Sequence, residues 1–144
     1  MVPKWFENAK LGIFIHWGIY AVNSTMESWA FTYPDMSTDD YMKQLDGFTA
    51  SKYDPEEWAE LFAKAGARYA VLTTMHPDGV ALWDSTHWPL NVVNDTPAGR
   101  DLVGPYADAL REKGIKVGFY LSHAIWSMDE YLSVICDRPI EEIR

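Results

Sequence analysis

The stretch "DPEEWAELFAKAGARYAVLTT", residues 54 to 74, holds a helix followed at once by a strand. Asp54 can cap the helix, Pro55 suits its first turn, and Gly66 suits its end. Residues 68–74 are apolar and β-branched, which predicts a buried strand. The apolar residues of the helix recur at intervals of three, four and seven and predict one stripe facing a core: Trp58, Leu61, Phe62 and Ala65.

The same unit extends in both directions along the chain. Short apolar runs at 11–15 and 116–122 predict two more strands, and a helix is expected from near Pro105 to Gly114. A further helix is expected over 127–136, and residues 19–53 form a long connection with short helical turns. This alternation predicts an α/β fold with parallel strands and right-handed crossovers. A doubly wound sheet and a barrel both fit the pattern.

Composition limits the function. The 144 residues are 48% hydrophobic and carry a formal net charge of -9, so we expect a globular chain. The acidic balance argues against nucleic acid or an anionic membrane surface as the main partner, and no run of eighteen apolar residues occurs. Cys136 is the single cysteine, which excludes an intramolecular disulfide and a cysteine metal site. No glycine-rich nucleotide motif follows the first strand, and we expect no cofactor.

Histidines follow all three predicted strands: His16, His76 and His123. Ligands of parallel α/β folds meet the carboxyl ends of the strands, because the loops that follow the strands gather there. One such histidine is commonly structural, but three at one edge favour a binding site.

Aromatic residues accompany the histidines in the same loops, and flat rings suit the C–H faces of a sugar: Trp17, Trp29, Trp83 and Trp126. Each of them could instead be core. Glu27, in the aromatic segment "MESWAF", needs a polar partner if it is buried. Asp78 and Gly79 are typical of a turn.

Three segments together resemble the catalytic domain of the α-L-fucosidases of glycoside hydrolase family 29. They are "WFENAKLGIFIHWGIYAV", "DPEEWAELFAKAGARYAVLTTMHPDGVALWDS" and "GRDLVGPYADALREKGIKVGFYLS". The resemblance runs from Trp5 to about Trp126. It implies a (β/α)8 TIM barrel and retaining hydrolysis of α-L-fucosides from oligosaccharides or glycoconjugates by a pair of carboxyl groups.

The resemblance also implies substrate-binding residues. His16 matches a histidine that touches the sugar hydroxyls, and His76 matches the first of a histidine pair after the second strand. Glu27 and Trp29 resemble the family's Glu-Trp pair, although Ser28 separates them here. The predicted substrate-binding set is His16, Trp17, Glu27, Trp29, His76 and Tyr120.

The loop after the second strand departs from the family's usual Lys-His-His-Asp-Gly-Phe. Here Pro77 replaces the second histidine and Met75 replaces the lysine. Proline removes a hydrogen-bonding partner from the pocket, so we expect weakened or altered sugar choice and a binding role for His76.

Only about three βα units are readable in residues 1–144, whereas a (β/α)8 barrel takes roughly 250 residues. We therefore expect the N-terminal portion of a barrel domain that lacks the later βα units, with no catalytic residue of its own. The isolated chain should be inactive and should self-associate through exposed strand edges. A non-catalytic sugar-binding relative is the alternative, and a metal-dependent hydrolase built on the three histidines is disfavoured because no His-x-His spacing occurs.

Overall fold

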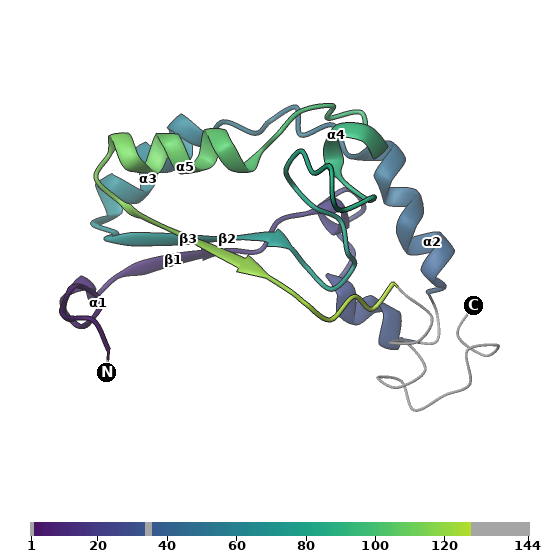
Figure 1. Cartoon of the computed structure of the whole chain (residues 1–144), viewed down its shortest axis with the longest axis horizontal. Coiled ribbons are helices and arrows are strands. Elements are labelled where there is room, and N and C mark those ends of the chain that lie inside the picture. Colours follow the sequence, from purple (N-terminus) through teal and green to yellow (C-terminus); the bar gives the residue numbers. More distant parts are fainter. Residues whose placement is uncertain (1, 34–35, 128–144) are drawn as a thin grey trace.

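The centre of the protein is a parallel sheet of three strands (Figure 1). The computed structural model describes residues 2–33 and 36–127. Strands β1 (Gly12–Ile15), β2 (Tyr69–Met75) and β3 (Lys116–Leu121) lie in the order β1-β2-β3. Each strand agrees with its prediction to within one residue at either end, and the predicted α/β class with parallel strands is confirmed.

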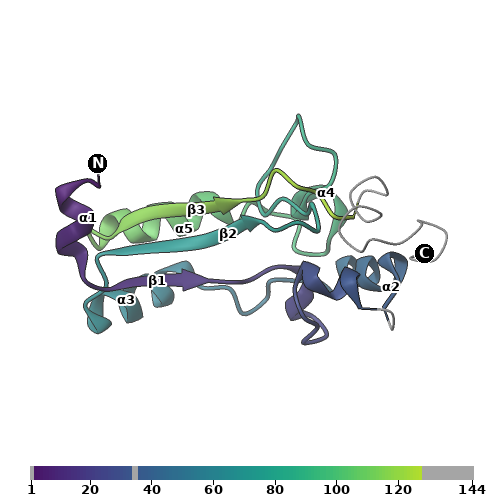
Figure 2. The same cartoon turned by 90° about the horizontal axis from the view of Figure 1, so that it is seen from below.

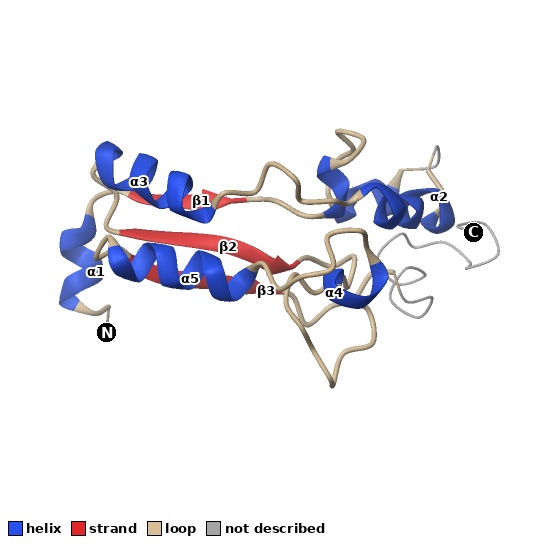
Figure 3. Cartoon of the chain, turned by 90° about the horizontal axis from the view of Figure 1, so that it is seen from above, coloured by secondary structure: helices blue, strands red, loops and turns tan. Residues whose placement is uncertain are grey.

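Two helices, α3 (Pro55–Ala65) and α5 (Val103–Glu112), cover the same face of the sheet (Figures 1 and 3). The Asp54 carboxylate accepts the first-turn N–H of Glu57, and Gly66 ends α3 in the left-handed conformation at φ 85°. Helix α5 begins two residues before the predicted Pro105. The core under both helices consists of Ala59, Phe62, Ala67, Ala70, Leu72, Tyr106, Ala109, Leu110 and Ile115.

The predicted apolar stripe of α3 is wrong at two positions, because Leu61 and Ala65 are exposed. Ala59 and Phe62 instead form the buried side of this helix. Helix α3 packs on the sheet and on α5, and among the described residues nothing covers the flank that carries Leu61. Sequence periodicity marks an apolar face without showing which part of it finds a partner.

The connections at the carboxyl ends of the strands pack together into a second core. The long connection after β1 contains η1 (Ile19–Ala21), η2 (Ser28–Thr32), α2 (Thr38–Met42) and η3 (Lys43–Gly47), which confirms the predicted short helical turns. The connection after β2 contains α4 (Val92–Asp95). Residues from both connections fill this core, among them Ile19, Phe31, Tyr41, Phe48, Leu82, Val92 and Leu102.

At the opposite end of the sheet lies α1 (Lys4–Ala9), a helix that the sequence pattern did not predict. The rings of Trp5 and Phe6 contact Tyr69 at the start of β2, with centroids 6.3 and 5.2 Å away. Gly12 of β1 permits this arrangement, since any Cβ at that position would overlap the Tyr69 ring.

The second face of the sheet is bare in the described part of the chain, and Phe14 on it is 54% exposed (Figure 2). Strands β1 and β3 form the two edges of the described sheet. No helix among the described residues is long and apolar enough to cross a membrane. The helix predicted over 127–136 lies almost wholly outside the described residues.

Candidate functional site

Rings from the ends of all three strands meet on the bare face of the sheet. The ring of His16, directly after β1, lies 5.3 Å from that of His76, directly after β2. Tyr120 of β3 stacks on His76 at 5.8 Å, and Phe14 stacks on His16 at 5.3 Å. Successive side chains of a strand alternate between faces, and Ile15, the neighbour of Phe14, packs under the helices. The predicted meeting of strand-end histidines is confirmed for this pair.

His76 is buried, and one of its two ring nitrogens is already engaged. The Ser28 hydroxyl of η2 lies 2.6 Å from Nδ1. Burial, together with a smaller effect of the neighbouring His16, lowers the pKa of His76 to about 4. The imidazole is therefore neutral at neutral pH, which suits a hydrogen-bonding role rather than a positive charge.

The turn after His76 is held by a buried carboxylate. Asp78 accepts the N–H of Val80 at Oδ1 and the hydroxyl of Tyr41 at Oδ2, both at 3.0 Å. Gly79 has φ 81° and donates its N–H to the carbonyl of His76, so the predicted turn is confirmed. Burial raises the pKa of Asp78 to about 7, while its two hydrogen bonds oppose that rise. The Asp78 carboxyl group therefore supports the loop after β2 from inside the protein and does not face solvent.

Thr73 ties the end of β1 to β2. Its buried hydroxyl accepts the N–H of Trp17 and donates to the Trp17 carbonyl, each at 3.1 Å. The Tyr20 hydroxyl lies 3.2 Å from the same oxygen, and the Tyr20 ring packs edge-on against His76 at 5.8 Å. The backbone between His16 and η1 is thus fixed to the strand that carries His76.

Comparison with known proteins identifies the family. The family model described as alpha-L-fucosidase matches residues 1–141. The chain belongs to the α-L-fucosidase family. The resemblance carried by the three sequence segments is thereby confirmed.

Individual relatives show how much of the family the chain represents. Tissue alpha-L-fucosidase of Homo sapiens is 38% identical over 91% of this chain and 31% of its own length. The structure of alpha-L-fucosidase isoenzyme 1 from Paenibacillus thiaminolyticus is 44% identical with a TM-score of 0.81, covering 89% of this chain and 30% of that one. A GH29 α-L-fucosidase from Bacteroides thetaiotaomicron, a trapped covalent intermediate, is 32% identical with a TM-score of 0.77, covering 85% and 30%. The chain spans just under a third of these relatives.

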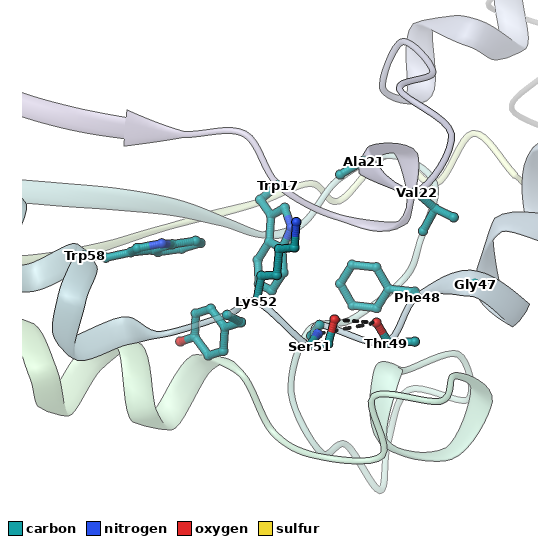
Figure 4. A pocket seen from close by; sticks show the side chains of 11 residues that line it. Trp17, Ala21, Val22, Gly47, Phe48, Thr49, Ser51, Lys52 and Trp58 are labelled. Atoms are coloured by element: carbon teal, nitrogen blue, oxygen red, sulfur yellow. Dashed lines mark hydrogen bonds between the residues drawn. The ribbon is translucent and has the colours of Figure 1, made fainter.

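Trp17 lies apart from the histidines of this α-L-fucosidase family member. Its ring stacks on Tyr53 at 5.0 Å and packs edge-on against Trp58 of α3 (Figure 4). Together with Phe48 and Lys52, these rings line an open cavity of about 440 Å³. The structure therefore does not bring the predicted substrate-binding Trp17 to the ring group of His16 and His76, although its backbone is joined to Thr73.

Glu27 and Trp29 flank the residue that holds His76. Trp29 is 51% exposed and meets Trp126 edge-on at 4.7 Å, while the N–H of Trp126 donates to the carbonyl of Pro77. Two tryptophans from distant loops thus lie beside the histidine loop. Glu27 is partly buried. The pKa of the Tyr20 hydroxyl is raised mainly by burial, and the negative charge of Glu27 makes a smaller contribution in the same direction.

The third strand-end histidine does not join the group. His123 is exposed, because Ser122 before it is held by the Met75 carbonyl and by the carbonyl of Ala124. His123 follows β3 as the sequence predicted, but the structure shows no contact between its ring and those of His16 and His76. Across the described residues no group of three His, Cys, Asp or Glu is placed so that it could hold a metal ion.

The sequence pattern did not predict a role for Ser28 or Tyr41 at the site. Local pattern marks Ser28 only as the residue that separates Glu27 from Trp29, and Tyr41 falls within the long connection over residues 19–53. The position of Ser28 between two predicted site residues was the one feature of the sequence that could have pointed to it. No local pattern pointed to Tyr41, whose partner lies 37 residues away.

Proposed function

We propose that this chain supplies part of the sugar pocket of a retaining α-L-fucosidase, and that it forms the first three βα units of a (β/α)8 barrel. The observation that carries the proposal is the contact of the His16, His76 and Tyr120 rings at the carboxyl end of the sheet in a member of this family. In parallel α/β folds that edge is where ligands bind.

The arrangement of layers supports a barrel over a doubly wound sheet. The strands follow one another in sequence order, and both crossover helices cover the same face. A doubly wound sheet has helices on both faces, whereas a barrel has them only outside. The bare face with Phe14 and Tyr120 would then line the barrel interior.

Each residue of the group has a chemical role in this proposal. His16 and His76 exchange hydrogen bonds with sugar hydroxyls, and Tyr120 adds a ring and a hydroxyl. The exposed Trp29 and its partner Trp126 offer aromatic surface to the C–H groups of the sugar or of its leaving group. Glu27 is a candidate acceptor for a further hydroxyl, while Trp17 contributes through its backbone contact with Thr73.

We also propose that the isolated chain has no turnover. A retaining glycosidase needs two carboxyl groups about 5–5.5 Å apart across the scissile bond. Of the carboxylates associated with the described ring group, Asp78 is buried and engaged by Tyr41 and Val80, which leaves Glu27.

Binding of L-fucose tests the pocket directly. At about 0.3 kcal/mol per non-hydrogen atom a monosaccharide should bind with a Kd on the order of millimolar. We expect saturable NMR shifts at His16, His76 and Tyr120 with L-fucose and none with D-fucose. The variant His76→Ala should abolish them, whereas His123→Ala, a strand-end histidine outside the group, should not. Equal shifts with both enantiomers would reject the pocket, and release of nitrophenol from 4-nitrophenyl α-L-fucoside would reject the absence of turnover.

A non-catalytic sugar-binding relative is the second candidate, and Pro77 favours it. Pro77 is buried and its carbonyl accepts from Trp126, so this position offers the sugar no side-chain hydrogen bond. L-Fucose binding that persists without turnover in a chain extended through all eight βα units would support this reading.

We further propose that the edges of the sheet associate with a second copy of the chain. Strands β1 and β3 are edge strands, and Phe14 and Phe119 on them are 54% and 50% exposed. Light scattering should show a concentration-dependent dimer or larger species. Phe119→Lys should weaken it, since a charge on an edge strand disfavours pairing. A monomer at all concentrations would contradict the proposal.

A further inference from the structure

Ser28 joins the long connection after β1 to the loop after β2 by one buried hydrogen bond. Its hydroxyl oxygen lies 2.6 Å from Nδ1 of His76, 48 residues further along the chain, and Ser28 is completely buried. Water does not reach a group at this depth, so loss of the bond would leave Nδ1 unsatisfied. The second ring nitrogen, Nε2, has no hydrogen bond among the described residues and is the one that a ligand can use.

The rings around His76 fix the plane of its imidazole but not which way round the imidazole lies in that plane. Tyr120 stacks on it with an interplanar angle of 28°, while Tyr20 and His16 approach it edge-on at 5.8 and 5.3 Å. A half-turn about the Cβ–Cγ bond keeps the plane and exchanges Nδ1 with Cδ2 and Nε2 with Cε1. The ring contacts are similar in both orientations, because the shape of the imidazole hardly changes. The Ser28 hydroxyl distinguishes them, since the nitrogen forms a hydrogen bond with it and the carbon does not.

The residue after Ser28 presents an aromatic surface beside the same loop. Trp29 is 51% exposed, and its ring meets that of Trp126 edge-on at 4.7 Å. The backbone N–H of Trp126 donates to the carbonyl of Pro77, the residue after His76. The short helix η2 therefore contacts the loop after β2 directly through Ser28 and indirectly through Trp29.

We propose that Ser28 is a positioning residue of the sugar pocket, which holds His76 with Nε2 available to a sugar hydroxyl and keeps the exposed Trp29 ring in a fixed place beside it. This inference rests on the proposed function. An arrangement that exists before binding reduces the cost of ordering the site around its ligand. It also favours the sugar whose hydroxyl and C–H groups match the placement of the nitrogen and the ring.

Apolar contacts hold η2 in place independently of the Ser28 hydroxyl. Ala30 and Phe31 of this helix are 4% and 3% exposed and belong to the core formed by the two connections. The Phe31 ring lies 4.5 Å from that of Tyr41 in α2. Ser28→Ala removes one oxygen and leaves these contacts unchanged, so we expect the variant to fold and to differ in the orientation of His76.

Nuclear Overhauser contacts in the full chain test this orientation without any sugar. Cε1 is bonded to Nδ1, so in the unaltered chain we expect the β protons of Ser28 to contact Hε1 of His76 and not Hδ2. In Ser28→Ala the imidazole is free to take both orientations, and the methyl group introduced at position 28 should contact both protons. Ser28→Thr keeps the hydroxyl and should restore the contact with Hε1 alone.

Ser122→Ala is the matched control at the end of β3. It removes another buried serine hydroxyl, which donates to the carbonyl of Ala124 at 2.8 Å and does not contact His76. The orientation of His76 should be that of the unaltered chain. A contact of Ser28 with Hδ2 in the unaltered chain would overturn the proposal, and this measurement requires no variant. A single unchanged orientation in Ser28→Ala would overturn it as well.

Titration with L-fucose tests the role of Ser28 in the pocket. Loss of the orienting hydrogen bond should weaken binding on the order of tenfold in Ser28→Ala and move the indole N–H signal of Trp29. Ser28→Thr should regain the affinity, and Ser122→Ala should keep it. Undiminished affinity in Ser28→Ala would overturn the role in the pocket. Absence of L-fucose binding in the unaltered chain would reject the proposed function and this role with it, while an orientation of His76 that is lost in Ser28→Ala would still stand.

Discussion

The two ends of the sheet are stabilised by different kinds of contact. At the amino end, Trp5 and Phe6 of α1 pack on Tyr69 and are still 44% and 43% exposed. The Lys116 ammonium sits 5.0 Å from the centre of the Trp5 ring. These contacts are apolar or cation–π contacts near solvent, so the loss of one leaves no polar group buried without a partner.

At the carboxyl end, the contacts are hydrogen bonds among buried polar groups. Ser28, Thr73 and Asp78 are 3% exposed or less, and each has a hydrogen-bonding partner. Removing one partner leaves the other buried and unsatisfied, at a cost of about 1–3 kcal/mol. We conclude that substitutions at the carboxyl end cost more stability than those at the amino end, and that the buried Asp78 and His76 of the carboxyl end couple stability to pH.

The largest expected effect is the pH dependence of Asp78→Asn. The folded pKa of Asp78 is raised from 3.8 to about 7, so the folded state holds more protons than the unfolded state in that range and the contribution of Asp78 to stability falls as pH rises. The pKa of His76 is lowered from 6.5 to about 4, so its contribution rises with pH from about 4 to 6.5. The two oppose each other in the unaltered chain.

Asp78→Asn leaves His76 unopposed, so the free energy of unfolding should rise by roughly 3 kcal/mol from pH 4 to 6.5, at about 1.4 kcal/mol per unit of pKa shift. Urea titrations at several pH values measure this. Asp84→Asn, at an exposed aspartate in the following loop, is the control and should keep the nearly level profile of the unaltered chain. The same level profile in Asp78→Asn would show that the pKa of Asp78 in the folded state is not raised.

A pair of glycine substitutions compares the two ends at matched backbone geometry. Gly79 at the carboxyl end and Gly66 at the amino end have φ of 81° and 85°. A Cβ at Gly79 would lie 2.7 Å from Cγ2 of Ile125, whereas one at Gly66 would meet nothing within 4 Å. Left-handed backbone costs a residue with a Cβ about 1–2 kcal/mol. Gly66→Ala should lose about that much stability and Gly79→Ala roughly twice as much, as measured by urea unfolding at pH 7. Equal losses of stability would mean that the loop around Ile125 shifts and relieves the close contact with the added Cβ.

The smallest effect is expected at Lys116. An exposed cation–π contact contributes about 0.5 kcal/mol, so Lys116→Met should lower the free energy of unfolding by that amount at most. Lys113→Met removes an exposed lysine for which the structure shows no aromatic contact and serves as the reference in the same thermal melts. A loss above 2 kcal/mol at Lys116 would contradict the view that the amino end consists of individually weak contacts.

The sequence by itself determined the three strands, the helices α3 and α5, and their order. The cap at Asp54, the left-handed Gly66 and the apolar runs of the strands act over a few residues, so α3 and all three strands could be placed from local pattern alone. The same run of residues identified the family and marked His16 and His76, because the carboxyl end of a parallel strand is defined once the strand is.

Tertiary structure decided which of these residues meet. Ser28 reaches His76 and Tyr41 reaches Asp78 across 48 and 37 residues, because η2 and α2 pack over the turn after β2. Trp17 turns toward Tyr53, His123 stays exposed and Leu61 finds no described cover, although all three fit their local patterns. Capping and periodicity are properties of neighbouring residues, whereas burial and hydrogen bonding of a side chain depend on what the rest of the chain places beside it.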